Sequence, residues 1–408
     1  MSNRRIKVCL FSTTHAPLDA RIFYREARTL SRNGYDVTIL TPARFDVLVQ
    51  DGVKIIGLGT ATGKLARFFN LWRVFWLALR QDADIYHFHD MELCLVGWLL
   101  HRLKDKPVIY DVHENFPEFM LDKAWLPMGL RRPIGCLVKA YELWVARRIQ
   151  GIIVVNQLLK ERFEKVNTHV VLLGNYPPRV SALSRQYAQL SENMSSSSCQ
   201  LQDLIYIGPI GSDRGLDVMV DVIKQLHDRY PQLRLLLLGP IMPEAKKIMD
   251  GPVEDWTNSV QWLGVVPHEE LHSYLHRSLA GLLLYQPSLN NILGTPNKLF
   301  EYMAAGLPVV CSNFVFMRQY VESAQCGLLV DPQDSSAVSD AVEKLLQDPR
   351  DARAMGERGR QAVVNQFCWE TVERDLLSLY ASLVKQFLPS GVHAVGDSEL
   401  FDHLRARE

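Results

Sequence analysis

Several features that define other classes of protein are missing from this sequence. None of its seven cysteines, at positions 9, 94, 136, 199, 311, 326 and 368, forms a CxxC pair. An odd and dispersed set of cysteines fits neither a disulfide framework nor a zinc site, and it indicates a reducing compartment. The 45 basic and 45 acidic residues cancel, so net charge gives no reason to expect nucleic acid as a partner.

Long apolar runs and dinucleotide-binding glycine motifs are absent as well. No stretch reaches the roughly 20 apolar residues of a membrane-spanning helix. The short run IKVCLF (6–11) is interpreted as a first buried strand and not as part of a signal peptide. We therefore expect a cytoplasmic protein, with a peripheral position on the cytoplasmic face of a membrane left open. Because no strand-like run is followed by GxGxxG, the sequence disfavours a dinucleotide oxidoreductase.

Strand-like apolar runs alternate with helical stretches along most of the chain. They include KVCLF, DVTIL, ADIYHFH and GIIVVN in the first half, and LIYIG, LRLLLLG, AGLLLY and LPVVCS in the second. This alternation is typical of βαβ units and parallel sheets. We predict an α/β protein of two facing, doubly wound Rossmann-like domains with a cleft between them.

The predicted organisation has five parts. An N-terminal domain covers 1–180, a polar, Ser-rich linker or loop covers 181–200, and a C-terminal domain covers 201–368. A C-terminal helix at 369–388 is expected to pack back on the first domain, followed by a mobile tail at 389–408. Ligands of such sheets bind beyond the carboxyl ends of the strands, so the residues that follow each strand are the candidates for a site.

In the first half, polar and charged residues follow three strand-like runs. They are His15, Asp19 and Arg21, then His89 and Asp90, then Asp111, His113 and Glu114. Histidines beside carboxylates suit the recognition of sugar hydroxyls or the transfer of a proton. An alternative role for Asp19 is to cap the following helix. The spacing matches no usual metal motif, so we predict no metal.

The segment GTPNKLFEYMAAGLPVV (294–310) predicts a short helix followed by a strand. Thr295 suits the N-cap, Pro296 the first helical position, and Gly306 the left-handed residue after the helix. Lys298 and Glu301 share one face, and Lys298 lies in the first turn, where the helix dipole favours an anion. The pattern indicates a phosphate-bearing ligand whose hydroxyls donate to Glu301. The alternative is an ion pair on a solvated helix face.

A second strand end in this half points to the same ligand. The turn GPIGSDRG (208–215) carries one arginine, Arg214, just before a helix. Backbone amides of such a turn and one guanidinium can together hold a diphosphate.

Taken together, the motifs resemble those of the family 4 retaining glycosyltransferases of the GT-B fold over nearly the whole chain. The resemblance rests on HAPLDARIFYREARTLSRNGYDVTIL, HFHDMEL, YDVHENFPE, YIGPIGSDRGLDVMVDVI, NNILGTPNKLFEYMAAGLPVV, GLLVDP and FCWE. It implies a metal-independent hexosyltransferase, without a cofactor, which moves a sugar from a UDP- or GDP-type donor to a glycan or lipid-linked glycan. The expected setting is the synthesis of a surface polysaccharide, such as lipopolysaccharide or exopolysaccharide.

The resemblance also implies roles for the candidate residues. His113, Arg214 and Lys298 would be catalytic, with His113 beside the reacting centre and Arg214 neutralising the donor diphosphate. Glu301 would accept hydrogen bonds from the ribose hydroxyls. The full donor-binding set is Gly208, Gly211, Arg214, Gly294, Thr295, Asn297, Lys298 and Glu301. The acceptor-binding set is His15, Asp19, Arg21, His89, Asp90, Asp111 and Glu114.

Two positions depart from the pattern of the family. Leu293 stands where the first glutamate of a Glu-x7-Glu pair normally holds the donor sugar. Pro209 stands where many members carry an arginine that pairs with the phosphates, so Arg214 is left to carry that role nearly alone.

Two basic-aromatic stretches suggest contact with an anionic membrane surface, where a lipid-linked acceptor would be found. They are 63–81 (GKLARFFNLWRVFWLALRQ) and 123–148 (KAWLPMGLRRPIGCLVKAYELWVARR). The alternative is a pair of ordinary core helices with snorkelling arginines.

Two other functions stay open at the level of sequence. One is a different enzyme on the same fold, such as a sugar-nucleotide epimerase or a phosphorylase. The other is a catalytically weak nucleotide-sugar-binding subunit of a polysaccharide assembly, which Leu293 favours. Turnover of the donor that depends on an added acceptor would separate a transferase from both.

Overall fold

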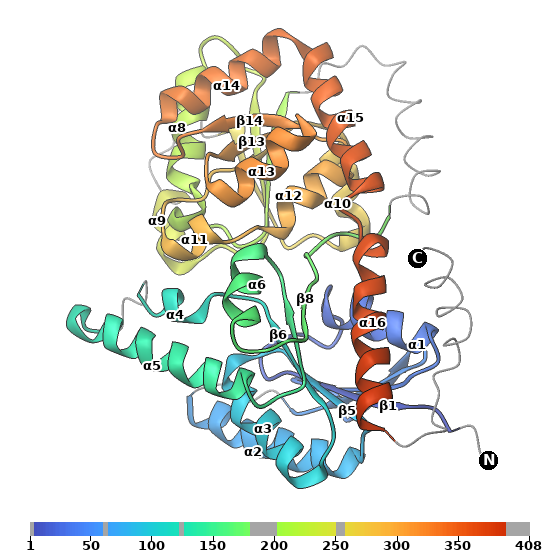
Figure 1. The fold of residues 1–408 in the computed structure, drawn as a ribbon. Helices are drawn as coiled ribbons and strands as arrows, with labels where there is room; N and C mark the ends of the chain where they lie inside the picture. Colours follow the sequence, from blue (N-terminus) through green and yellow to red (C-terminus); the bar gives the residue numbers. More distant parts are fainter. Residues whose placement is uncertain (1–3, 60–63, 122–125, 180–201, 250–257, 389–408) are drawn as a thin grey trace. The chain divides into compact units, whose positions relative to one another are not determined.

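The computed structural model describes residues 4–59, 64–121, 126–179, 202–249 and 258–388 (Figure 1). The chain forms two compact units, one of residues 1–175 with 369–408 and the other of residues 176–368. Each unit is a mainly parallel sheet with helices packed on it, which confirms the predicted class of two Rossmann-like domains. The predicted linker at 181–200 and the predicted tail at 389–408 lie outside the described residues.

Unit 1, the one that contains the N-terminus, has an eight-stranded sheet in the order β3-β4-β2-β1-β5-β6-β7-β8. Its strands are β1 (Lys7–Phe11), β2 (Asp36–Thr41), β3 (Val47–Gln50), β4 (Val53–Gly57), β5 (Ile85–Phe88), β6 (Val108–Val112), β7 (Gly151–Val154) and β8 (Val170–Leu172). The strand β3 pairs antiparallel with β4, and the other described pairs are parallel. Its helices are the π-helix η1 (Ile22–Ala27), α1 (Arg28–Arg32), α2 (Lys64–Gln81), the 3₁₀ turn η2 (Met91–Leu93), α3 (Cys94–Lys104), α4 (Phe116–Phe119), α5 (Met128–Ala146), α6 (Gln157–Glu164) and α16 (Trp369–Phe387).

Alternate residues of the unit 1 strands feed two separate cores, one on each face of the sheet. Val8 and Leu10 of β1 lie in the first core, whereas Cys9 and Phe11 lie in the second, as expected for a strand buried on both faces. Helices η1, α1 and α16 cover the first face, while α2, α3, α5 and α6 contribute to the second (Figure 1). The predicted C-terminal helix therefore packs on the first domain, where Trp369 Nε1 donates to Thr29 Oγ1 at 2.9 Å.

Unit 2 has a six-stranded sheet in the order β11-β10-β9-β12-β13-β14. Its strands are β9 (Asp203–Ile207), β10 (Arg234–Leu238), β11 (Val260–Gly264), β12 (Ser278–Leu283), β13 (Val309–Ser312) and β14 (Gly327–Val330). Its helices are η4 (Ser212–Arg214), α8 (Leu216–Leu226), η5 (Pro243–Ala245), α9 (Lys246–Met249), α10 (His268–His276), α11 (Leu289–Leu293), α12 (Asn297–Ala304), α13 (Val315–Ala324), α14 (Ser335–Gln347) and α15 (Pro349–Asn365). All described strand pairs in this sheet are parallel.

Helix α12, the helix predicted from 294–310, begins one residue later than expected. Pro296 has φ −71° and ψ 136° and precedes the helix, so the prediction that it is the first helical residue is wrong. The proline ring fixes only φ, and its value suits both a helix and polyproline II backbone. The difference lies in ψ, which the sequence does not reveal. Thr295 is not the N-cap, and no side chain caps this end. The end is as predicted, because Gly306 adopts φ +69°.

None of the helices in the described ranges combines the length and the apolar character needed to cross a membrane.

Candidate functional site

The predicted residues of unit 1 gather around Asp111, at the end of β6. The Asp111 carboxylate is fully buried and accepts from Arg21 Nε at 2.7 Å and from Arg21 Nη2 at 3.0 Å. It also accepts from His113 Nε2 at 2.9 Å. The other donors of Arg21 reach Leu173 O at 2.9 Å and Asn175 Oδ1 at 2.8 Å. Asp111 therefore orients His113 through a carboxylate that a buried arginine holds in place.

Asp90 and Asp19 form the outer part of this site. Asp90 accepts from Ser12 Oγ at 2.8 Å and from the backbone N–H of Thr13 at 2.6 Å. The carboxylate of Asp19 contacts His15 Nδ1 at 3.1 Å, and the rings of His15 and His113 meet edge to face at 5.0 Å. The side chains of His15, Asp19 and His113 are 27%, 24% and 14% exposed, so these three can meet a ligand.

The capping role considered for Asp19 is also present. Its Oδ1 accepts from the backbone N–H groups of Arg21 and Ile22, at 2.8 and 3.0 Å, at the start of η1. Asp19 thus holds the helix start and His15 together. Glu114 is exposed, in contrast to the buried His89, Arg21 and Asp111.

Electrostatics keep the carboxylates of this site ionised. Burial alone would raise the pKa of Asp111, but the charges of Arg21 and His113 bring it well below its usual range. Burial likewise opposes the ionisation of Asp19, and the hydrogen bond from His15 still lowers the pKa of Asp19. Burial would lower the pKa of His15, but the hydrogen bond to Asp19 and the charges of Asp19, Asp90 and Asp111 raise it.

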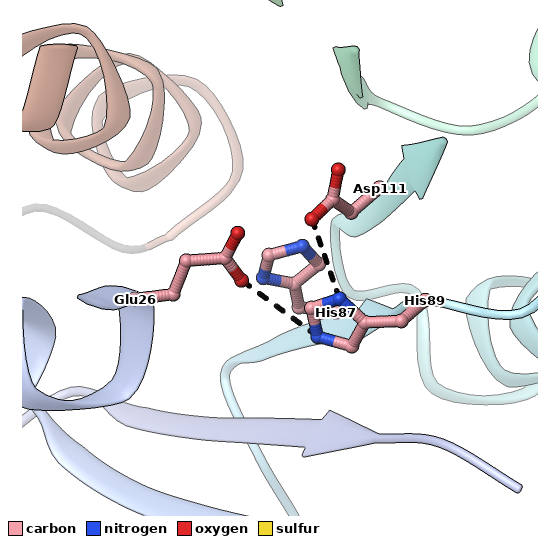
Figure 2. A group of neighbouring side chains, drawn as sticks. All are labelled: Glu26, His87, His89 and Asp111. Atoms are coloured by element: carbon pink, nitrogen blue, oxygen red, sulfur yellow. Dashed lines mark ion pairs between the residues drawn. The ribbon is translucent and has the colours of Figure 1, made fainter. Parts of the chain in front are cut away.

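Beneath this site lies a cluster of four fully buried groups, Glu26, His87, His89 and Asp111, called here the buried cluster (Figure 2). Each offers one metal-ligand atom, and these atoms lie within 4.8 Å of one another. His89 points between the two carboxylates, with Nδ1 at 3.4 Å from Asp111 Oδ2 and Nε2 at 3.8 Å from Glu26 Oε2 (Figure 2). A guanidinium already occupies the position of a cation, because Arg21 Nε lies 2.7 Å from Asp111 Oδ2 and 3.0 Å from Glu26 Oε1.

In unit 2, Lys298 extends over the end of β9. Its Nζ donates to Tyr285 Oη at 3.0 Å and to Tyr206 Oη at 3.4 Å. Its side chain crosses Gly208, where a Cβ would meet Lys298 Cε at 2.4 Å and Nζ at 2.6 Å, and where φ is +106°. The positive φ at 208 therefore favours glycine, and a Cβ there would also push the end of the lysine side chain aside.

Arg214 contacts the same tyrosine. Its guanidinium lies 4.4 Å from the centre of the Tyr285 ring, and its Nη1 donates to Asn291 Oδ1 at 3.1 Å. Asn291 is fixed in turn, because its Nδ2 donates to Gln286 O at 2.8 Å. Two cations, Lys298 and Arg214, thus lie against one tyrosine ring beyond the carboxyl ends of adjacent strands.

The other predicted donor residues occupy the turns around these cations. Gly211 is buried, and a Cβ there would lie 2.8 Å from Asp213 Oδ1. Glu301 is half-buried on α12, one turn after Lys298, while Asn297 is exposed at the start of that helix. Thr295 Oγ1 is buried and has no hydrogen-bond partner in the structure, and Gly294 precedes it in extended backbone. Two residues near this site depart from the family pattern. Leu293 is the last residue of α11, and the carbonyl oxygen of Pro209 accepts a hydrogen bond from Tyr206 Oη at 2.8 Å.

The residues that contact the candidate site and were not selected from the sequence include Tyr206, Tyr285, Asn291, His87 and Glu26. Tyr206 and Tyr285 each stand at or just beyond a strand end (YIG and LLLYQ), and this position is the signal that could have found them. Asn291 gives no comparable signal. Glu26 could have been found because it falls on the apolar face of its helix, four residues after Ile22 and three after Phe23.

Known proteins are similar to this chain in both of its units. Residues 20–175 match the family model described as Glycosyltransferase Family 4, and residues 199–362 match the one described as Glycosyl transferases group 1. The chain is 23% identical to glycogen synthase of Mycobacterium tuberculosis, across 85% of this chain and 76% of that protein. It is 35% identical to the O-antigen chain mannosyltransferase B of Escherichia coli, across 33% of this chain and 32% of that protein.

Solved structures share the fold at low sequence identity. Sucrose-phosphate synthase of Thermosynechococcus elongatus has a TM-score of 0.74 and 20% identity, with 94% of this chain and 100% of that chain covered. Anabaena HepE in complex with UDP-glucose has a TM-score of 0.65 and 15% identity, with 93% and 100% covered. Each family model matches most of one unit, and the folds of these solved structures match that of this chain over nearly its full length. The chain therefore belongs to the family 4 glycosyltransferases of the GT-B fold.

Proposed function

We propose that the protein is a retaining, metal-independent hexosyltransferase which uses a UDP- or GDP-sugar. Its acceptor is a glycan or lipid-linked glycan of a surface polysaccharide. The observation that carries the proposal is the pair of cations in unit 2, Lys298 and Arg214, held against Tyr285 at the ends of β9 and β12. Relatives named for glycogen and O-antigen synthesis, and a fold neighbour that binds UDP-glucose, support a nucleotide-sugar donor and a glycan product.

The cations suit the departure of a nucleoside diphosphate. Breaking the bond between the sugar C1 and the phosphate oxygen places negative charge on the diphosphate, and preorganised donors stabilise this charge. Lys298 and Arg214 supply them, and Glu301, one turn along α12, is positioned to accept from the ribose hydroxyls. The acceptor oxygen bonds to C1 on the face that the leaving group vacates, and its proton passes to the departing phosphate oxygen. This accounts for retention without a glycosidase-like pair of carboxylates.

In unit 1 we assign the contacts with the acceptor and the reacting centre to His15, Asp19 and His113. These side chains are partly exposed, whereas Arg21, His89 and Asp111 are buried and hold them from below. Asp90 anchors the turn that carries His15.

The donor site is tested by thermal unfolding with UDP, GDP, ADP and CMP. A ligand at about 100 times its dissociation constant adds about 2.7 kcal/mol. We expect UDP or GDP to raise the melting temperature of the wild type, and Glu301→Ala to remove most of this shift. Glu322→Ala, at an exposed position of α13, is the control and should keep the shift.

No shift with any nucleotide would contradict the donor site. If a nucleotide binds but the corresponding nucleotide-sugar is not turned over in the presence of glycan acceptors, the protein is instead a binding subunit. Leu293 is the feature that makes this second outcome worth testing.

We further propose that unit 1 lies on an anionic membrane surface. Helix α2 exposes Phe69, Trp72 and Trp76 at 69%, 50% and 55%, on a stripe that also includes the exposed Arg73 and Arg80. Residue 63, the side chains of 64–68, and residues 123–125 of the two predicted stretches lie outside the described residues.

Helix α5 extends this surface on the same face of the sheet. Met128, Leu130 and Leu137 are 82%, 52% and 69% exposed, and Arg132 and Lys139 are exposed beside them. Both helices contact α3. Exposed apolar side chains interleaved with basic ones suit the interface of an anionic bilayer.

We expect the wild type to co-sediment with vesicles of 30% phosphatidylserine at low salt, and binding to fall at high salt because the basic side chains are screened. The double variant Trp72→Ser/Trp76→Ser should lose most of the bound fraction. The control Val265→Ser/Val315→Ser removes two apolar side chains from unit 2 that are 77% and 65% exposed, and it should bind as the wild type does. Equal binding by both double variants would rule out α2 as the membrane contact.

A further inference from the structure

The buried cluster poses a problem of charge. Arg21 and Asp111 form a bidentate ion pair whose charges cancel. Glu26 is a second carboxylate at the same guanidinium, 0% exposed, with its Oε1 at 3.0 Å from Arg21 Nε. While His113 is neutral, an ionised Glu26 would therefore leave one negative charge uncompensated inside the unit, and this costs several kcal/mol in a protein interior. One more proton in the cluster removes this cost.

The surroundings of Glu26 favour the carboxylic acid as the holder of this proton. Burial and the charge of Asp111 raise the pKa of Glu26 well above its usual range. Burial lowers the pKa of His89 to about 4, and it also lowers that of His87. The charged or titratable groups around Glu26 come from η1 and the turn before it, from β5 and β6, and from α16: Asp19, Arg21, His87, His89, Asp111 and Tyr380.

We propose that Glu26 is a positioning residue for the glycosyl transfer and that it holds one proton for the buried cluster. A neutral Glu26 does not compete for Arg21, so Arg21 stays paired with Asp111 and Asp111 keeps its hydrogen bond with His113. An ionised Glu26 would compete for Arg21 Nε, since its oxygen is only slightly farther from that atom than the Asp111 oxygen is, at 3.0 against 2.7 Å. The ion pair that fixes Asp111 would loosen, and His113 would lose its orientation. The part of the proposal that concerns His113 rests on the proposed function, whereas the proton on Glu26 does not.

The same geometry argues against a bound metal ion in place of the proton. A cation coordinated by Glu26, His89 and Asp111 would lie beside the Arg21 guanidinium, which already contacts both carboxylates. Metal analysis of the purified protein gives a direct check, because a stoichiometric metal ion that is lost in Glu26→Gln would overturn the proposal.

The proton is tested by the pH dependence of unfolding. A group whose pKa is higher in the folded than in the unfolded state makes its full contribution to the stability of the folded protein at pH values below the unfolded pKa. This contribution is lost as the pH rises toward the folded pKa. Glu26→Gln keeps the shape of the acid but cannot ionise. We expect the unfolding constant of the wild type, relative to that of Glu26→Gln, to rise by up to about tenfold per pH unit from roughly pH 5 upward.

Asp84→Asn is the control for this measurement, because hydrogen bonds from Arg4 and Lys7 oppose the effect of burial and lower the pKa of Asp84. The ratio of the unfolding constants of the wild type and Asp84→Asn should stay constant above pH 5. A ratio for Glu26→Gln that is also flat from pH 5 to 9 would show that Glu26 is ionised in the folded protein and would overturn the proposal.

Positioning is tested by the release of UDP from UDP-glucose, or of GDP from a GDP-sugar if the thermal screen selects GDP. At pH 7, Glu26→Gln should keep kcat within about threefold of the wild type, and Glu26→Ala should lower kcat with little change in KM. Glu142→Gln, which alters another buried carboxylate of unit 1, should leave kcat unchanged. A folded Glu26→Gln that loses tenfold or more in kcat would overturn the proposal. Absence of turnover in the wild type would count against the proposed function alone, since the unfolding test still reports on Glu26.

Discussion

Replacing Arg21 by methionine is expected to destabilise unit 1 by about 3–5 kcal/mol, the usual cost of removing one partner from a buried ion pair. Arg21 is 4% exposed and gives hydrogen bonds to Asp111, Leu173 and Asn175. Methionine fills a similar volume, so most of the loss would come from the uncompensated Asp111 carboxylate. Hydrogen exchange of peptides from β6 and β7, followed in increasing urea, measures the effect within this unit.

Two further variants make this expectation specific. Arg234→Met removes a bidentate pair with Asp203 in which the arginine is 48% exposed, and exposed pairs contribute only about 0–1 kcal/mol. The double variant Arg21→Met/Asp111→Asn should recover part of the loss, because it also removes the stranded charge. If Arg21→Met cost no more than Arg234→Met, the view of Arg21 as the electrostatic centre of unit 1 would be wrong.

The second large effect is on catalysis. Lys298→Met should lower kcat by about 10²–10³, the typical loss for one preorganised donor that stabilises charge in the transition state. The reason is the position of Nζ, which two tyrosine hydroxyls hold beside the end of β9. Steady-state release of the nucleoside diphosphate measures the change, with circular dichroism to confirm that the variant is folded.

The control for this substitution is Lys224→Met, which removes a lysine of α8 that pairs with Asp221 at 3.6 Å. It should leave kcat near the wild-type value. Gly208→Ala should act in the same direction as Lys298→Met, because the added Cβ would displace the lysine side chain. An unchanged kcat in Lys298→Met would contradict the proposed role of this lysine.

Much of the architecture could be predicted from the sequence because it depends on local patterns. Alternating apolar runs and helical stretches specify βαβ units, and they gave the two-sheet class correctly. The strand ends then marked where polar groups would gather, since parallel strands deliver their carboxyl ends to one edge of a sheet. His15, His89, Asp111 and His113 do come together there.

The sequence by itself thus determined the fold class, the family and the edges of the sheets where chemistry is possible. Only the tertiary structure decided which of those residues are buried supports and which are accessible, as Arg21 and His15 illustrate. It also decided that Glu26 joins His87 and His89 at the end of β5, that Tyr285 contacts both Lys298 and Arg214, and that α12 begins after Pro296. These outcomes depend on contacts between residues far apart in the chain and on a single ψ angle, and neither leaves a periodic signal in the sequence.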